Sequence, residues 1–173
     1  MEPPKYPVGP LQLEETIDAK QQAAFIAEIE AAPSLLRQAV KGLSEHQLDT
    51  LYKNWTIRQI VHHLADSHIN SYVRFKWTLT EETPLIKAYD ENLWTELPDA
   101  KTGSIDAPLL TMDGIHARWI QLLRAMTPEM FAKAYKHPDG KTRSLVTALG
   151  LYAWHGRHHT GQILWIREQK GWG

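Results

Sequence analysis

Four long segments of this chain repeat their apolar residues with the period of an α-helix, and this pattern limits the fold more than any other feature. The segments span roughly residues 15–42, 56–79, 105–126 and 143–170. Thr56 is a suitable N-cap for the second segment. At about 100° per residue, the apolar positions of that segment share one face. They are Ile57, Ile60, Val61, Leu64, Ala65, Tyr72 and Phe75. Four such helices predict an all-α fold, a four-helix bundle.

The segments between the helices are less regular. Residues 1–14 are rich in proline and predict an extended arm that lies on the domain or on a partner subunit. Pro33 cannot donate an intrahelical hydrogen bond, so it should kink or divide the first helix. Residues 81–104 form a long connection with at most a short helix at about 91–97, and connections of this length often cover a functional pocket. The H-P-D-G-K sequence at 137–141 predicts a tight turn and a small hairpin.

Length and charge exclude several classes of protein. The 173 residues are enough for one domain, residues 1–173, with a real core. A net charge of −1 leaves no basic face for nucleic acid or an anionic membrane. The chain has no apolar run long enough to span a bilayer, and its first residues lack the order of a signal peptide. We therefore expect a cytoplasmic protein. Because the chain has no cysteine, any metal must be held by His, Asp or Glu.

The stretch L-Y-A-W-H-G-R-H-H-T-G-Q-I at 151–163 places three histidines within five residues. Positions four apart lie on one helix face, so His155 and His159 have the spacing of two ligands to one metal ion. The alternative is a polar, partly exposed helix rich in imidazole. Both side chains lie within or at the edge of the apolar face, where a polar group needs a metal or a hydrogen bond. His158 points elsewhere and is not expected to be a ligand. Gly156 and Gly161 would let a neighbouring helix approach closely.

A third ligand has to come from another helix, and His63 is the candidate. It heads a polar strip on residues 56–79, which is either solvated surface or the wall of a polar site. The strip consists of Gln59, His63, Asp66, Ser67, Asn70 and Arg74. A site made of His63, His155 and His159 would leave coordination positions open, and its neutral ligands would let the ion strongly acidify a bound water. Asp66, one turn after His63, could orient a ligand or accept a proton, or could be an ordinary solvated aspartate.

The remaining histidines suggest other roles. His62 is not part of the polar strip. His68 and His116 fall on apolar faces, which favours hydrogen-bonded core residues over a pocket role. Gly156 occupies the position where the H-E-x-x-H zinc proteases carry their general base, so a peptidase of that type is disfavoured.

Several separated blocks resemble the DinB superfamily, and most closely its YfiT-like members. They are W-T-I-R-Q-I-V-H-H-L-A-D-S-H at 55–68, R-F-K-W-T-L-T-E-E-T-P at 74–84, H-P-D-G at 137–140 and L-G-L-Y-A-W-H-G-R-H-H-T-G-Q-I at 149–163. The resemblance implies a four-helix bundle, usually a homodimer, with one zinc or nickel ion per subunit on His63, His155 and His159. YfiT-like tails are still richer in histidine where this chain has Gly156 and Arg157, which puts secondary proton-shuttling roles in doubt.

Three functions are compatible with these features. The first is a metal-dependent hydrolase, in which the three-histidine site activates water against a small substrate. The second, also implied by the family, is transfer of a low-molecular-weight thiol such as bacillithiol to small electrophiles, where Arg74, Arg118 or Arg157 could bind the thiol's carboxylates. The third is a non-catalytic metal-binding module of a stress response.

Overall fold

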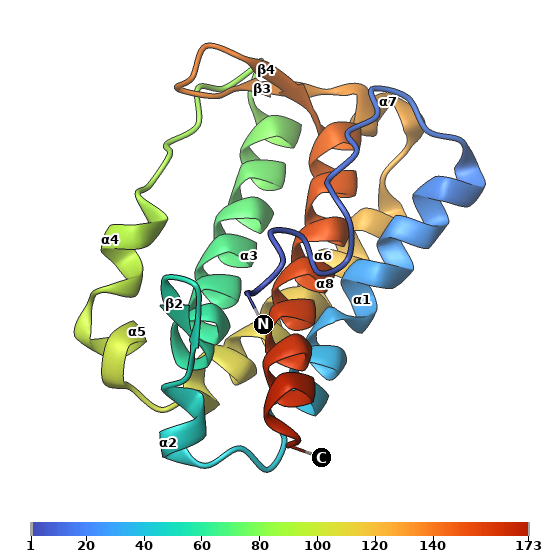
Figure 1. Ribbon diagram of the computed structural model, residues 1–173. Helices are drawn as coiled ribbons and strands as arrows, with labels where there is room; N and C mark the ends of the chain where they lie inside the picture. Colours follow the sequence, from blue (N-terminus) through green and yellow to red (C-terminus); the bar gives the residue numbers. More distant parts are fainter. Residues whose placement is uncertain (1, 173) are drawn as a thin grey trace.

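The computed structural model describes residues 2–172, and its four long helices form the predicted bundle (Figure 1). The helices are α1 (Ala19–Val40), α3 (Ile57–Thr80), α6 (Asp106–Ala125) and α8 (Leu145–Lys170). α1 lies against α6 and α8, and α3 lies against the same two helices. α3 and α6 run in the same direction, so residues 81–105 must return along the whole bundle before α6 can begin (Figure 1). Within residues 2–172, no helix is both long and apolar enough to cross a membrane.

The connections carry four short helices and two hairpins. The bounds are α2 (Glu45–Leu48), α4 (Glu91–Thr95), α5 (Pro98–Thr102), α7 (Pro128–Ala132), β1 (Leu51–Tyr52), β2 (Trp55–Thr56), β3 (Ala134–Lys136) and β4 (Thr142–Ser144). The expected hairpin around 137–141 is the antiparallel β3–β4 pair. The β1–β2 hairpin and α5 were not expected from the sequence.

Polar caps set where the long helices begin. The hydroxyl of Thr56 accepts the backbone N–H of Gln59, whose side chain accepts the backbone N–H of Thr56, so α3 begins with a complete capping box. Asp18 caps α1, which therefore starts at Ala19 and not at Glu15 as the apolar period suggested. Pro33 lies inside α1 and does not divide it.

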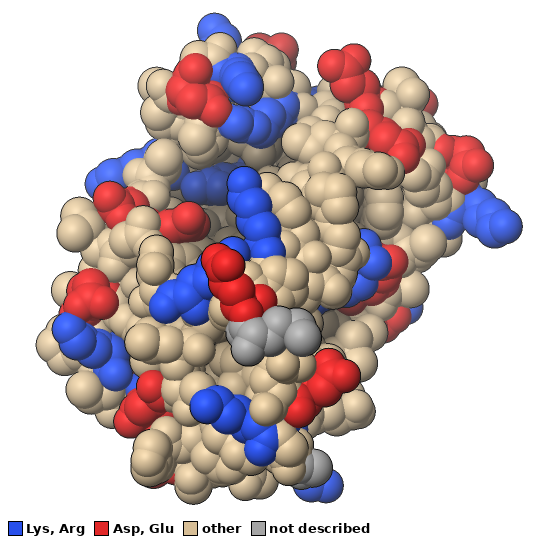
Figure 2. Space-filling view, viewed as in Figure 1, with Lys and Arg blue, Asp and Glu red and all other residues tan. Residues whose placement is uncertain are grey.

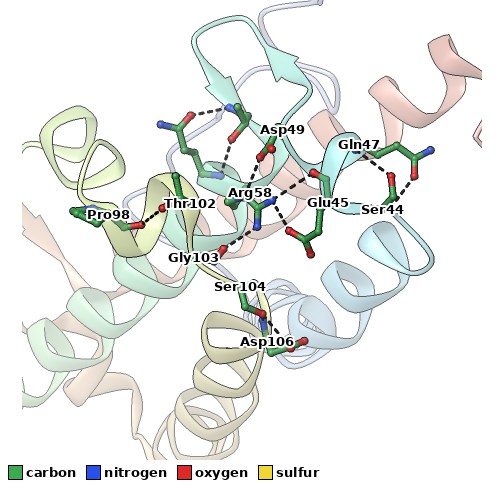
Figure 3. Close-up of polar contacts among 12 residues, drawn as sticks. Ser44, Glu45, Gln47, Asp49, Arg58, Pro98, Thr102, Gly103, Ser104 and Asp106 are labelled. Atoms are coloured by element: carbon green, nitrogen blue, oxygen red, sulfur yellow. Dashed lines mark hydrogen bonds and ion pairs between the residues drawn. The ribbon is translucent and has the colours of Figure 1, made fainter.

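The lower end of α3 is tied to its neighbours by one buried arginine (Figure 3). The Arg58 side chain is only 4% exposed. Its Nε donates to Asp49 at 2.9 Å and its Nη2 to Glu45 at 2.7 Å. Its Nη1 donates to the carbonyl of Gly103 at 2.8 Å. One guanidinium thereby joins α2 and α3 to the C-terminal end of α5, which holds the end of the long connection against the bundle.

The N-terminal arm packs on α8 of its own chain. Trp154 Nε1 donates to the carbonyl of Gly9 at 3.0 Å, and the ring of Tyr6 contacts Trp154 edge-on. A Cβ built on Gly161 would come within 2.9 Å of Val8, so Gly161 makes room for the arm and not for a helix. Gly156 does meet a helix, because its Cβ position lies 3.2 Å from Ala32 of α1. Met1 of the expected arm lies outside the described residues.

The hydrophobic core is split into two clusters along the bundle. The cluster toward the β3–β4 end includes Phe75, Trp119 and Leu149. The cluster toward α2 includes Leu36, Leu64 and Ile163. On every long helix the two clusters occupy different stretches of sequence. Five histidines of α3, α6 and α8 contact one another across the middle of the molecule, and we call this polar group the histidine layer. Its members are His63, His68, His116, His155 and His159.

Candidate metal centre

Three imidazoles of the histidine layer converge as the spacing predicted. His63 comes from the first half of α3, and His155 and His159 come from successive turns of α8. One ring nitrogen from each of the three lies within 4.8 Å of the others. His63 and His159 are buried, whereas His155 is partly exposed to the cavity in front of it. The fold thus brings together residues that are 92 positions apart.

The spacing of these nitrogens fits a metal ion. Nε2 of His63 and Nε2 of His155 lie 3.2 Å apart. Two ligand nitrogens on a tetrahedral zinc, at about 2.0–2.1 Å from the ion, are separated by roughly 3.3–3.4 Å. Imidazoles must also be neutral to bind a metal. Burial lowers the pKa of His63 to about 4, and burial with the neighbouring histidines holds the pKa of His155 and of His159 well below the usual value. All three are therefore neutral at physiological pH.

His155 begins a chain of hydrogen bonds that leads away from the centre. Its Nδ1 lies 3.2 Å from Nε2 of His68, and Nδ1 of His68 lies 2.8 Å from Nε2 of His116. Nδ1 of His116 lies 2.7 Å from the carbonyl oxygen of Ile29. Burial lowers the pKa of His116 to about 4 and that of His68 well below its usual value. The chain is thus made of neutral rings, each carrying one hydrogen.

The Ile29 carbonyl at the far end of this hydrogen-bonded series determines which ring nitrogen of each histidine carries the hydrogen. The Ile29 carbonyl can only accept, so His116 carries its hydrogen on Nδ1 and accepts at Nε2. His68 must then donate from Nδ1 and accept at Nε2, which makes His155 donate from Nδ1. The Nε2 lone pair of His155 is left free and could bind a metal ion. Outer partners of this kind fix the tautomer and orientation of a ligand.

Pro33 explains why the Ile29 carbonyl is available. In an α-helix the N–H of residue 33 bonds the carbonyl of residue 29, but proline has no N–H. The orphaned carbonyl of Ile29 instead accepts from His116 of α6. The residue expected to break α1 therefore supplies the anchor for the relay formed by His68 and His116.

We expect His116→Leu to weaken zinc binding by about 10- to 100-fold, the usual effect of losing an outer partner of a metal ligand. Leucine removes the acceptor that holds the hydrogen of His68 on Nδ1. His116→Gln is the matched control, because its amide can donate to Ile29 and accept from His68, and we expect it to stay within about threefold of wild type. Competition with a chromophoric chelator measures the affinity, and ¹⁵N NMR of His68 reports the tautomer. Equal affinity in the two variants would contradict the relay.

The variant Pro33→Ala tests the same hydrogen-bonded series at the Ile29 carbonyl, where the series ends. The new N–H would compete with His116 for the Ile29 carbonyl, so the ordered tautomer of His68 should become mixed in the ¹⁵N spectrum. An unchanged spectrum would show that the missing N–H of Pro33 has no part in the relay.

His159 is oriented by a different partner, also on α8. Its Nδ1 lies 2.8 Å from Oε1 of Gln162, and Nε2 of Gln162 lies 3.1 Å from Nε2 of His158. The amide oxygen can only accept, so His159 donates from Nδ1 and keeps its Nε2 lone pair. His158 accepts from the amide and stacks on Trp154 at 4.4 Å between ring centroids. As expected, it is not one of the three converging histidines.

A cavity of about 390 Å³ opens onto the three histidines. Trp55 forms part of its wall and lies over His63, with ring centroids 4.5 Å apart. Glu91 and Asn92 of α4 line it from the long connection, as that connection was expected to do. Burial, and then the charge of Asp90, raise the pKa of Glu91. Sequence reasoning missed Glu91 because it lies in a segment without periodicity, where nothing indicates which side chains point inward.

The structure does not bring Asp66 to this cavity, although it lies one turn from His63. Burial, and then the nearby charge of Asp99, raise its pKa to about 6, so Asp66 faces the α5 side of α3. His62 is also buried on that side, close to the backbone of residues 103–104. Of the three candidate arginines, Arg118 lies over the Tyr72 ring and Arg157 pairs with Glu28 at 3.1 Å.

The chain is similar to several known proteins. A family model described as the DinB superfamily matches residues 28–163. The curated protein "Putative metal-dependent hydrolase YfiT" of Bacillus subtilis (strain 168) is 45% identical over 172 residues, which cover 96% of each chain. A "Putative metal-dependent hydrolase" of Bacillus anthracis (strain A0248) is 45% identical over 170 residues, covering 97% of this chain and 98% of that protein.

Two solved structures are similar to this fold. The structure of YfiT from Bacillus subtilis, described as a probable metal-dependent hydrolase with an unusual four-helix bundle topology, superposes with a TM-score of 0.94. It is 45% identical, and the match covers 97% of this chain and 98% of that one. The mycothiol-dependent maleylpyruvate isomerase superposes with a TM-score of 0.64 at 17% identity, over 80% of this chain and 59% of that one. This second likeness concerns the fold alone.

Proposed function

This chain belongs to the DinB superfamily, and from that premise we propose that it is a metal-dependent hydrolase that acts on a small substrate. We propose that His63, His155 and His159 hold one divalent ion, zinc or nickel, per chain. The observation that carries the proposal is the convergence of three neutral imidazoles on one cavity, with the Nδ1 atoms of His155 and His159 already bonded to His68 and Gln162. Only their Nε2 atoms remain to face the cavity.

The side chains that line the cavity at the three histidines suit a hydrolysis reaction. When bound, the ion would supply a Lewis acid that polarises a substrate oxygen and acidifies a coordinated water. The three ligands carry no charge, so they leave that polarising power undiminished. Glu91 lines the same cavity, and we propose that its carboxylate accepts the proton released during attack. Its raised pKa moves it toward the working pH, which is what a general base requires. Asp66 receives no role in this proposal because it does not line the cavity.

The test is turnover of small esters and amides by protein loaded with zinc or with nickel. We expect metal-dependent product from at least one substrate in the absence of any thiol. Glu91→Gln should lower kcat by about 10²- to 10⁴-fold, the usual contribution of a general base, while metal content stays at one ion per chain. Asn92→Ala changes the neighbouring residue of the same cavity without removing a carboxylate and is the matched control.

The same assay separates the alternatives. If product forms only when a low-molecular-weight thiol is added, the protein is a thiol S-transferase and not a hydrolase. The ion would then hold the thiolate. Stoichiometric metal without turnover across the panel, with and without thiols, would favour the non-catalytic metal-binding module.

A further inference from the structure

A second cavity, of about 500 Å³, lies beside the metal cavity and shares a wall with it. His155, Glu91 and Asn92 line both cavities. The second cavity extends from this wall toward Arg74 of α3 and His137 of the β3–β4 turn. Figure 2 shows Lys and Arg side chains at the edges of a hollow on this face, below the β3–β4 hairpin and beside α4. A molecule that reacts at the histidines could therefore extend into this space.

Arg74 of α3 forms no ion pair with a carboxylate of residues 2–172. Five other arginines form ion pairs within the chain. They are Arg37, Arg58, Arg124, Arg143 and Arg157. Nε of Arg74 is buried without a hydrogen-bond partner, and Nη2 makes only a long 3.3 Å bond to the carbonyl of Lys87. A buried donor without a partner is destabilising, because it has lost its hydrogen bonds to water, and the loss is larger for a charged group. A guanidinium in this state at a cavity wall can bind a partner from outside the chain.

The carboxylates near Arg74 do not serve as that partner. Oδ1 of Asp90 is already used, since it accepts the backbone N–H groups of Asn92 and Leu93 at the start of α4. Glu91 lies on the shared wall and makes no ion pair with Arg74. Tyr89 contributes a neutral hydroxyl, because burial raises the pKa of its phenol. The cavity thus offers a fork of N–H donors and a hydroxyl to a ligand with two or more oxygens.

We propose that the second cavity binds an anionic group, a carboxylate or a phosphate, of the substrate, and that Arg74 is its main anchor. This proposal rests on the proposed function and names the substrate class, a small anionic molecule whose reacting bond lies at the histidines while its oxyanion lies against Arg74. Two parallel N–H···O bonds from one guanidinium would also fix the orientation of the molecule. Neither Arg118 nor Arg157 lines this cavity.

Anion binding to metal-free protein tests this inference separately from the chemistry. We expect malonate, inorganic phosphate or both to shift the ¹⁵Nε–H resonance of Arg74 saturably, whereas the neutral probe malonamide should not. Arg74→Gln should weaken anion binding at least tenfold in a calorimetric titration. Arg74→Lys keeps the charge but not the fork, so it should be intermediate. The matched control is Arg118→Gln, which removes an exposed arginine outside the cavity and should bind as wild type does.

The outcomes are distinct. A response to malonate alone identifies a carboxylate ligand, and a response to phosphate alone identifies a phosphate ligand. No saturable response to either anion, or equal binding by wild type and a folded Arg74→Gln variant, overturns the proposal. The anion titration uses metal-free protein, so a negative result there does not contradict the proposed hydrolase activity. A negative hydrolase assay likewise does not contradict the proposed anion site.

Discussion

Alanine at His63, His155 or His159 is expected to weaken zinc binding by roughly 10²- to 10³-fold. Zinc sites of four ligands bind with about 10–16 kcal/mol, so each ligand contributes roughly 3–4 kcal/mol. The effect should be similar for all three because each supplies one nitrogen to the same group. Competition against a chromophoric chelator measures the affinities, and circular dichroism of the metal-free variants shows that the helices are intact.

Two other histidines provide the controls for this experiment. His158→Ala should lose far less affinity, because His158 accepts from Gln162 and does not belong to the converging group. His46→Ala, in an exposed position on α2, should bind as wild type does. If alanine at His158 costs as much as alanine at His155, the ligand set proposed here is wrong.

Metal-free protein is expected to lose most of its stability as the pH falls from 6.5 to about 4. The pKa of His63 and that of His116 are each lowered from 6.5 to about 4. Between these values the unfolded chain binds more protons than the folded one, so stability is full above pH 6.5 and falls with pH. At about 1.4 kcal/mol per pH unit, the two groups together remove about 7 kcal/mol. Domains of this kind have only about 5–15 kcal/mol.

Other groups modify this acid transition in known directions. His68, His155 and His159 also have lowered pKa values and steepen the loss. Asp66 opposes it, because a pKa raised to about 6 makes the folded state take up its proton first. Urea unfolding at pH 7.5, 6, 5 and 4 measures the loss, and His116→Gln should reduce it by about 3 kcal/mol. A stability that stays constant over this range would contradict the neutral, buried state of the histidine layer.

The sequence predicts the helices of this fold better than its connections. Apolar periodicity located all four long helices because each must bury one face against the others. The sequence did not predict the β1–β2 hairpin, because its turn has no glycine and instead places Lys53 at a φ of 56°. The second short helix of the long connection, α5, also has no apolar period of its own, and it packs on α3 beside the Arg58 contact to Gly103.

The convergence of the three histidines was predictable from the sequence, but their surroundings were not. Spacing and polarity selected His63, His155 and His159, and His68 and His116 are the buried, hydrogen-bonded histidines that their apolar faces indicated. That both connect to His155 depends on how α3, α6 and α8 face one another, which no local pattern encodes. The single domain, the homodimer, the cytoplasmic location and the identity of the metal stay predictions.

Pro33 makes stability and function compete at one position of α1. Proline inside a helix is about 3 kcal/mol less favourable than alanine, so selection for a more stable bundle alone would remove it. The carbonyl that it frees on Ile29 is the last acceptor of the hydrogen-bonded series that begins at His155, a proposed metal ligand. Selection for thermostability in this protein would therefore have to keep Pro33, although a proline inside a helix is unfavourable for helix stability. An engineering strategy that repairs helix breakers would improve the scaffold and disorder the site.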